Sequence, residues 1–283
     1  MAEAVLSFFF MNGDVKKTEE FGELYHESKP AVYEVIRIVH GKPLFPKEHY
    51  ERLEGSMASI GQKTPLTYEE FCENVRKLAE ANGVEDYNCR LVITNFADGG
   101  AAATDNAGEA AGPDIYLFMI PTHYPTEEMY DRGVKVDLLH AVRNNPHSKI
   151  WNQELRTAAD NMIKERGLFE VLLLNEKDQV TEGSRSNIFF IFDNEAFTTP
   201  SEAVLLGVTR TKVIEACEKA GIKVNETYTT EEEIGDYEAA FVCGTSPKVL
   251  PIAAIGSTPM DTKQKLLRKI MALYDEICEE SLG

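Results

Sequence analysis

The spacing of apolar and polar residues predicts a sheet with two helices in the first part of the chain. Strands are predicted at 5–11, 32–39, 90–96 and 115–120, and helices at 46–60 and 67–82. Asn12-Gly13-Asp14 is typical of a tight turn between two strands. Thr67 is a suitable N-cap for the second helix. This part of the chain is therefore expected to be an α+β domain.

A long polar connection and a proline-containing stretch interrupt this pattern. Residues 97–114 are rich in Gly, Ala and Asp and exceed a tight connection, so they are predicted to form a functional or mobile loop. Residues 121–133 contain prolines and several charges and are predicted to be an interdomain linker. We therefore expect an N-terminal α+β domain at 1–120 and a C-terminal domain at 134–283.

The C-terminal part has more strand patterns than helix patterns. Strands are predicted at 134–140, 169–174, 187–192, 239–243 and 249–255, and helices at 153–166, 209–220 and 262–280. Gly221 follows the second of these helices, and glycine is the preferred residue just beyond a helix C-terminus. The second domain is therefore expected to be larger and rich in strands.

Composition and charge narrow the function classes. Of the 283 residues, 43% are hydrophobic and 27% are charged, as in ordinary globular proteins. The net charge of −18 disfavours nucleic acid and anionic membrane surfaces as partners. No apolar run approaches the roughly 20 residues that span a bilayer, so we expect a cytoplasmic protein with no membrane association.

The spacing of cysteines and histidines argues against two further classes. The 5 cysteines include no CxxC pair, so a disulfide framework is not expected. The 6 histidines form no HxxxH or HxH cluster, so no metal site is expected.

Five polar segments are candidates for chemistry, although each has an ordinary structural explanation on its own. They lie before a helix, before a strand, at a helix start, in a turn after a strand and on a helix face. A basic residue in such a place is most often solvated or in a surface ion pair. A helix start is most often simply capped, although its N–H groups can hold an anion. The segments are 145–152 with Lys149, Thr181-Glu182-Gly183 with Asn187, 205–210, Gly244-Thr245, and 49–53 with Arg52.

In their order along the chain, these segments resemble the fold-type IV pyridoxal-phosphate enzymes. This family comprises branched-chain aminotransferases, D-amino-acid aminotransferases and 4-amino-4-deoxychorismate lyases. The residues 32–37, Phe45 and 48–53 are most similar to the D-amino-acid branch. The resemblance covers nearly the whole chain. It implies a two-domain α+β fold with a strand-rich pseudo-barrel C-terminal domain, pyridoxal 5'-phosphate between the domains, and a homodimer.

The resemblance also implies roles for individual residues. Lys149 matches the lysine that joins the cofactor as a Schiff base and then moves a proton at the substrate. Glu182 matches the carboxylate that bonds the pyridine nitrogen and keeps it protonated. The other implied residues are a phosphate cup of Arg52, Val208, Thr209 and Thr245, then Leu205 on the ring face and Tyr33 on the substrate side.

The chain departs from the family pattern on the substrate side. Branched-chain enzymes carry a tyrosine where this chain has Gln153, and D-amino-acid enzymes carry a substrate-binding arginine where it has Asn95. Arg90 falls where branched-chain enzymes have a carboxylate-binding arginine, but the tyrosine two residues earlier is Asn88 here. Arg37 and Arg90 are therefore both candidates for the substrate carboxylate, and either is equally suited to a structural ion pair.

The function implied is transfer of an amino group from an amino acid to a 2-oxo acid by a pyridoxal-phosphate-dependent aminotransferase. One alternative is a 4-amino-4-deoxychorismate lyase, which uses the same lysine and cofactor to eliminate pyruvate. A second alternative is a protein that binds the cofactor and has lost catalysis. The substrate side chain stays open, as does the choice among L-amino acid, D-amino acid and amine.

Overall fold

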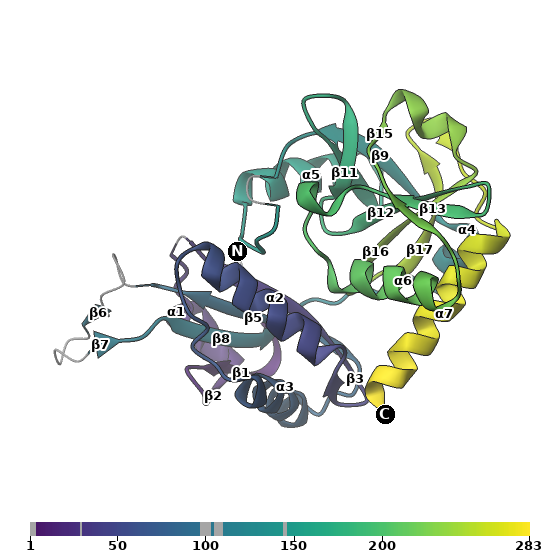
Figure 1. Ribbon diagram of the computed structural model, residues 1–283. Helices are drawn as coiled ribbons and strands as arrows, with labels where there is room; N and C mark the ends of the chain where they lie inside the picture. Colours follow the sequence, from purple (N-terminus) through teal and green to yellow (C-terminus); the bar gives the residue numbers. More distant parts are fainter. Residues whose placement is uncertain (1–3, 29, 97–102, 105–109, 144–145) are drawn as a thin grey trace. The chain divides into compact units, whose positions relative to one another are not determined.

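The computed structural model describes residues 4–28, 30–96, 103–104, 110–143 and 146–283 (Figure 1). The chain divides into two compact units. The first comprises Met1–His123, Ser148–Trp151 and Leu282, and the second comprises Tyr124–His147, Asn152–Ser281 and Gly283. Both units combine a sheet with helices, so the predicted α+β class is confirmed.

An antiparallel sheet of six strands forms the centre of the first unit. Its strands follow the order β2-β1-β8-β5-β3-β4. Their bounds are β1 Val5–Met11, β2 Asp14–Lys17, β3 Val32–Val39, β4 Lys42–Pro43, β5 Tyr87–Thr94 and β8 Asp114–Met119. Asn12 and Gly13 connect β1 to β2 with φ angles of 53° and 89°, as the predicted tight turn requires. β3 pairs with β5 from Val32↔Ile93 to Ile38↔Tyr87.

Two helices cover one face of this sheet, α2 (Pro46–Ser59) and α3 (Tyr68–Asn82), and both were predicted from the sequence (Figure 1). Thr67 caps α3 because its side chain accepts the Glu70 N–H at 3.2 Å, while a Glu70 carboxylate oxygen accepts the Thr67 N–H at 2.8 Å. This reciprocal pair satisfies two N–H groups at the start of the helix.

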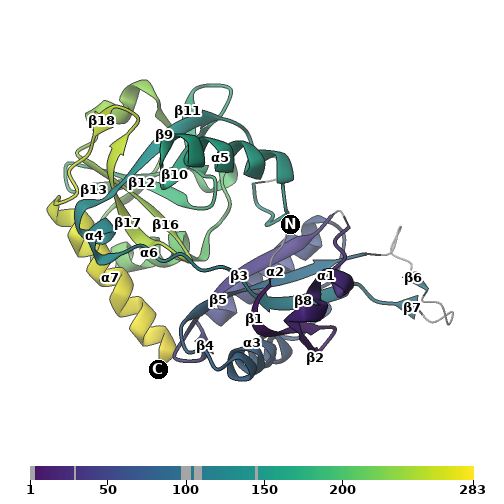
Figure 2. The ribbon, with the colours of Figure 1, turned by 180° about the vertical axis from the view of Figure 1, so that it is seen from behind.

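Apolar side chains fill both faces of the same sheet. Leu53 and Met57 of α2 and Phe71 and Leu78 of α3 are buried in one cluster with side chains of β3 and β5. A second cluster contains aromatic residues of β1, β3 and β8 together with Phe21. Phe21 begins α1 (Phe21–Leu24), which follows η1 (Thr18–Glu20) and is labelled in Figure 2. β3 and β5 are therefore central strands covered on both faces.

The second unit is built on a mixed sheet of ten strands. Its order is β14-β13-β12-β16-β17-β9-β10-β11-β15, with β18 beside β17. Strand bounds are β9 Val134–His140, β10 Glu170–Leu174, β11 Gln179–Gly183, β12 Asn187–Phe192, β13 Glu195–Thr198, β14 Val224–Glu226, β15 Thr229–Thr230, β16 Ala239–Gly244, β17 Lys248–Ile255 and β18 Thr258–Pro259. β9 runs parallel to both β10 and β17, while β12, β16 and β17 are antiparallel neighbours. The strand-rich character expected of this part of the chain is confirmed.

Helices pack against this second sheet (Figure 2). α5 (Gln153–Arg166) contacts β10, and α6 (Val208–Lys219) contacts β16. The last helix, α7 (Lys265–Leu282), begins after Gln264, whose side-chain oxygen accepts the first N–H groups. Short turns of helix occur at η3 (Ser201–Ala203) and η4 (Glu232–Asp236).

The stretch predicted as a linker contains a short helix, α4 (Glu127–Arg132), which packs on β17. Thr126 caps it by accepting the Met129 N–H at 3.3 Å. This helix is only 6 residues long, so the prolines and charges of 121–133 predict a linker instead of a helix. Within the residues described, no helix has the length and apolar character needed to cross a membrane.

Most of the loop predicted at 97–114 lies outside the described residues, namely 97–102 and 105–109. The described pieces include two short strands that pair with each other, β6 (Ala103–Thr104) and β7 (Ala110–Ala111).

Candidate active site

Lys149 lies beside β3 in the first unit. The segment Ser148–Trp151 runs along the start of that strand, where the Lys149 carbonyl accepts the Tyr33 N–H at 3.1 Å and the Trp151 N–H donates to Ala31 at 3.3 Å. The Lys149 Nζ lies 5.0 Å from the centroid of the Tyr33 ring. Two residues expected in one site, Lys149 and Tyr33, are thus neighbours.

Helix α2 holds this lysine segment through two serines. The buried Ser56 hydroxyl accepts the Lys149 N–H at 3.1 Å, and the Ser148 hydroxyl donates to Ser59 Oγ at 2.6 Å. Ser56 and Ser59 follow Arg52 at intervals that place all three on one face of the helix. The sequence singles out Arg52 and misses both serines, although this helical spacing was the available signal.

Arg52 belongs to a buried polar cluster with Glu34 and His49. Its Nε and Nη2 groups donate to the two Glu34 carboxylate oxygens at 2.8 and 2.6 Å, and His49 Nδ1 lies 2.8 Å from the same carboxylate. Burial alone would raise the Glu34 pKa, but the Arg52 charge and the hydrogen bonds from His49 and Arg52 lower it to about 2. Burial lowers the pKa of His49, against the opposing effect of Glu34. A charged Glu34 therefore fixes the Arg52 guanidinium on the inner side of α2.

Replacing Glu34 with glutamine should lower the free energy of unfolding by about 3–5 kcal/mol at neutral pH, because Arg52 loses its buried carboxylate partner. The pKa of Glu34 in the folded protein lies below the ordinary value of a glutamate carboxyl group. The stabilisation is therefore complete above the ordinary carboxyl pKa and disappears as the pH falls towards about 2. Urea unfolding of the unmodified protein and of Glu34→Gln at successively lower pH measures this difference in the free energy of unfolding.

The matched control is Glu51→Gln on the exposed side of α2, where Glu51 lies 3.8 Å from Lys47. That change should stay within about 0.5 kcal/mol of the unmodified protein. If the loss in free energy of unfolding caused by Glu34→Gln does not decrease as the pH falls, the role given to the Glu34 charge is contradicted.

The two candidate carboxylate-binding arginines have different neighbours. Arg37 donates from Nε and Nη2 to the carboxylate of Asp86 at 3.3 and 3.2 Å. The Arg90 guanidinium carbon lies 5.8 Å from the Tyr33 ring centroid and 5.1 Å from the Trp151 ring centroid. Arg90 is therefore the one that lies beside the lysine segment, and Trp151 is a neighbour that the sequence did not single out.

Glu182 lies at the end of β11 in the second unit and is 2% exposed. Both of its carboxylate oxygens are bound, since Arg143 Nε donates to one at 2.5 Å and the Leu205 N–H donates to the other at 3.2 Å. Arg143 also donates to the Ser184 carbonyl at 3.3 Å. A lone arginine in the polar segment after β9 gives no sequence signal that it will meet Glu182, so sequence reasoning missed it.

Two glycines of the predicted motifs are required by close approach. A Cβ on Gly183 would lie 2.1 Å from Ser186 Oγ, and a Cβ on Gly207 would lie 2.1 Å from Asn187 Oδ1. The Asn187 side chain also donates to the Leu205 carbonyl at 2.9 Å. Gly183, Asn187 and Gly207 therefore shape the turns that place Glu182 and Leu205.

The start of α6 is suited to an anion. Gly207 is its N-cap and has no side chain to bind the first N–H groups, while Val208 and Thr209 are each only 4% exposed. Uncapped N–H groups at the start of a 12-residue helix are donors for a phosphate. The Thr209 side chain hydrogen-bonds Tyr274, and burial raises the pKa of that phenol, which therefore keeps its proton. Thr245 lies in the turn between β16 and β17. These residues of the second unit fit a phosphorylated cofactor.

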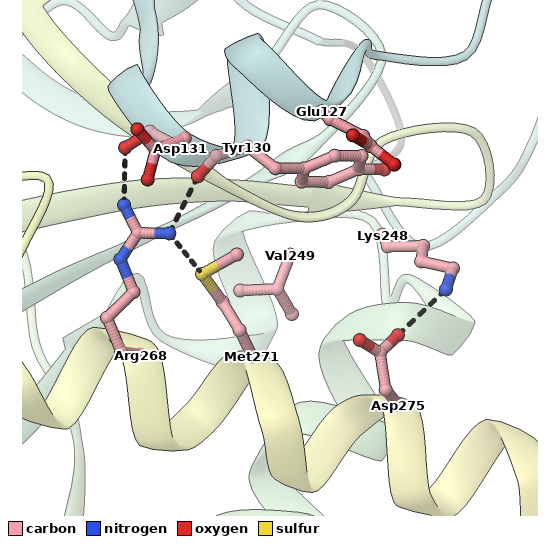
Figure 3. A pocket seen from close by; sticks show the side chains of 8 residues that line it. All are labelled: Glu127, Tyr130, Asp131, Lys248, Val249, Arg268, Met271 and Asp275. Atoms are coloured by element: carbon pink, nitrogen blue, oxygen red, sulfur yellow. Dashed lines mark hydrogen bonds and ion pairs between the residues drawn. The ribbon is translucent and has the colours of Figure 1, made fainter.

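A pocket of about 420 Å³ in the second unit does not contain the predicted site residues (Figure 3). It lies between α4, the start of β17 and α7, where Lys248 binds Asp275 at 2.7 Å and Arg268 donates to the Tyr130 carbonyl at 2.7 Å. Among the described residues, no group of three or more His, Cys, Asp or Glu side chains is placed to hold a metal ion.

The comparison with known families agrees with the resemblance drawn from the motifs. Residues 31–255 match the family described as "Amino-transferase class IV". The chain therefore belongs to the class IV aminotransferase family, and the resemblance stated from its motifs is confirmed.

Relatives from both branches of this family are similar to the chain. A D-alanine aminotransferase of Bacillus licheniformis is 28% identical over 229 residues, covering 79% of this chain and 78% of the relative. A putative branched-chain-amino-acid aminotransferase of Methanocaldococcus jannaschii is 28% identical over 263 residues, covering 91% and 89%. Sequence similarity therefore does not separate the two branches.

The fold is shared with solved aminotransferases. The structure of a branched-chain amino acid aminotransferase from Thermobaculum terrenum in its PLP form superposes with a TM-score of 0.80. The identity is 23%, and the match covers 99% of this chain and 95% of that one. The expected fold type is therefore confirmed.

Proposed function

We propose that the protein is a pyridoxal-phosphate-dependent transaminase that moves an amino group from an amino acid to a 2-oxo acid. The observation that carries the proposal is that the Lys149 amine and the Arg90 guanidinium both lie within 6 Å of the Tyr33 ring centroid. Membership of the class IV family and the doubly held Glu182 carboxylate support it. A site that had lost catalysis would not be expected to retain both Lys149 and Glu182.

The residues of the chain can be assigned to parts of the cofactor. Pyridoxal 5'-phosphate, when bound, supplies an electron sink for chemistry at the α-carbon of the substrate. The Val208 and Thr209 N–H groups, the Thr209 hydroxyl, Thr245 and Arg52 would hold its phosphate, and Leu205 would pack on its ring. These contacts combine charge and helix-dipole attraction for a dianion.

Lys149 and Glu182 would act directly in the reaction. The Lys149 amine would hold the cofactor through its carbonyl carbon and would carry a proton to and from the substrate α-carbon. Glu182 would accept a hydrogen bond from the pyridine nitrogen, and the hydrogen bonds from Arg143 and the Leu205 N–H orient the carboxylate.

Arg90 is our choice for the substrate carboxylate. The Arg90 guanidinium carbon and the Lys149 amine each lie within 6 Å of the centroid of the Tyr33 ring. An amino acid carries its amino group and its carboxylate on one carbon, so its two binding partners must be close to each other.

The proposed function is tested by a donor screen. The purified holoenzyme is given amino acids of both configurations and primary amines, with pyruvate or 2-oxoglutarate as acceptor. Turnover of at least one donor, absent from Lys149→Ala, supports the proposal. Pyruvate release from aminodeoxychorismate without an acceptor would instead identify a lyase. A bound cofactor spectrum with no turnover of any substrate would identify a protein that has lost catalysis.

We further propose that the protein is a homodimer, as the family resemblance implies, and cytoplasmic, as its sequence predicts. Light scattering during gel filtration should give twice the chain mass of 31.7 kDa. A monomer that retains full activity would contradict this part of the proposal.

A further inference from the structure

We propose that Trp151 is a positioning residue that, with Tyr33, holds the Arg90 guanidinium for the carboxylate of the substrate. Tyr33, Arg90 and Trp151 are called the Arg90 cage below. The inference rests on the proposed function and makes it more specific, because the cage would select amino acids and 2-oxo acids over amines without a carboxylate.

The cage is defined by three measured contacts. The Arg90 guanidinium carbon lies 5.1 Å from the Trp151 ring centroid and 5.8 Å from that of Tyr33. Both distances are within the roughly 6 Å at which a cation is attracted to an aromatic face. The two rings meet edge to face, with centroids 5.6 Å apart and planes at 75°. The two rings therefore contact each other as well as the arginine.

The backbone fixes each member of the cage independently. Trp151 donates its N–H to Ala31 at 3.3 Å, next to β3, and Tyr33 donates to Lys149 at 3.1 Å. Arg90 lies on β5, where it pairs with Val35 of β3 on one side and with Phe118 of β8 on the other. The Arg90 main chain is thus set by the sheet. What the two rings add is the direction of its long side chain.

Stacking is compatible with carboxylate binding because the two interactions use different parts of the guanidinium. A ring contacts the face of the planar group, while its N–H donors lie in the plane and match the two oxygens of a carboxylate. An arginine stacked on aromatic rings loses less side-chain freedom when it binds a carboxylate, so binding is tighter.

The position of Lys149 relates the Arg90 cage to the specificity for the substrate. The Lys149 Nζ lies 5.0 Å from the centroid of the Tyr33 ring, which is the ring that also contacts Arg90. The amine that would move a proton at the substrate α-carbon and the guanidinium that would bind the substrate carboxylate therefore both lie near one aromatic side chain. This suits a small molecule with both functions on neighbouring atoms, as in an α-amino acid.

The test compares leucine, in both configurations, with 3-methylbutylamine, which is leucine without its carboxylate. In the holoenzyme, Trp151→Leu should raise the KM for leucine by about 3- to 30-fold, the range expected for loss of a cation–π contact. The kcat for leucine and the KM for the amine should change less. Trp151→Phe keeps an aromatic face and should restore most of the leucine KM. Equal losses for both donors, or no rescue by phenylalanine, would overturn the proposal.

A binding experiment separates the cage from the proposed function because it needs no turnover. Trp151 is the only tryptophan in the sequence, so its fluorescence in the holoenzyme reports on the cage directly. Titration with 4-methylpentanoate, which is leucine without its amino group, should change this fluorescence in the unmodified protein but not in Arg90→Ala. Calorimetry with the same acid should show weaker binding to Trp151→Leu.

The two variants together form a double-mutant cycle. If Trp151 acts through Arg90, adding Trp151→Leu to Arg90→Ala should weaken 4-methylpentanoate binding no further. Independent effects would overturn the proposal, as would binding that Arg90→Ala leaves unchanged. If binding behaves as expected and the donor screen finds no turnover, the cage stands and the transaminase function fails.

Discussion

Lys149→Ala should lower kcat by about 10⁴-fold or more, at or beyond the upper end of what one acid–base group contributes, since the same amine is also the nucleophile. The folded protein should be little affected, because the hydrogen bonds of residue 149 to Ser56 and Tyr33 are made by its main-chain groups. The Lys149 N–H and carbonyl bind Ser56 and Tyr33, and an alanine keeps both.

Borohydride reduction of the holoenzyme, followed by peptide mass mapping, gives a measurement independent of rate. The pyridoxyl group should be found on Lys149. Lys47→Ala is the matched control, since Lys47 is exposed on α2 at the first turn and pairs only loosely with Glu51. Covalent label on another lysine, or an active Lys149→Ala enzyme, would remove the basis of the site assignment.

Glu182→Gln should lower kcat by roughly 10²- to 10³-fold, as for loss of one positioned electrostatic group, while the protein keeps its cofactor. The amide has the shape of the carboxylate but not its charge, so the pyridine nitrogen loses the partner that favours its protonated form. Cofactor retention is expected because the start of α6 and Thr245, rather than Glu182, would hold the phosphate.

Two measurements separate these effects: kcat with saturating donor, and bound cofactor by absorbance after gel filtration. Glu154→Gln, an exposed change on the first turn of α5, is the control and should behave as the unmodified enzyme. A Glu182→Gln enzyme with unchanged kcat would refute the role given to this carboxylate, and one that loses its cofactor would assign Glu182 to binding instead.

The elements that local rules govern could be predicted from the sequence. The helix predicted at 153–166 is α5 with those same bounds, because the Asn152 side chain caps its start and Gly167 ends it with a φ of 63°. The tight turn at Asn12 and Gly13 follows from the same kind of rule. In each case the signal lies within a few residues of the feature.

The polar pairs of the site could not be predicted in this way. Arg143 meets Glu182 across 39 residues and Arg52 meets Glu34 across 18 residues, so only the fold makes them neighbours. The choice between Arg37 and Arg90 also depends on register, since pairing of β3 with β5 places both on one face and Asp86 lies just before the start of β5. The residues near each arginine in the sequence do not indicate that Asp86 pairs with Arg37.

The assignment of Ser148–Trp151 to the first unit has a consequence for dissecting the protein. The chain leaves the second unit for these 4 residues and then returns, so no single cut yields two self-sufficient fragments. A fragment starting at residue 134 would contain Lys149 but neither Ser56 nor Tyr33, whose hydrogen bonds fix its main chain. Any gene fusion, split reporter or domain exchange should therefore keep the first unit and Ser148–Trp151 in one polypeptide.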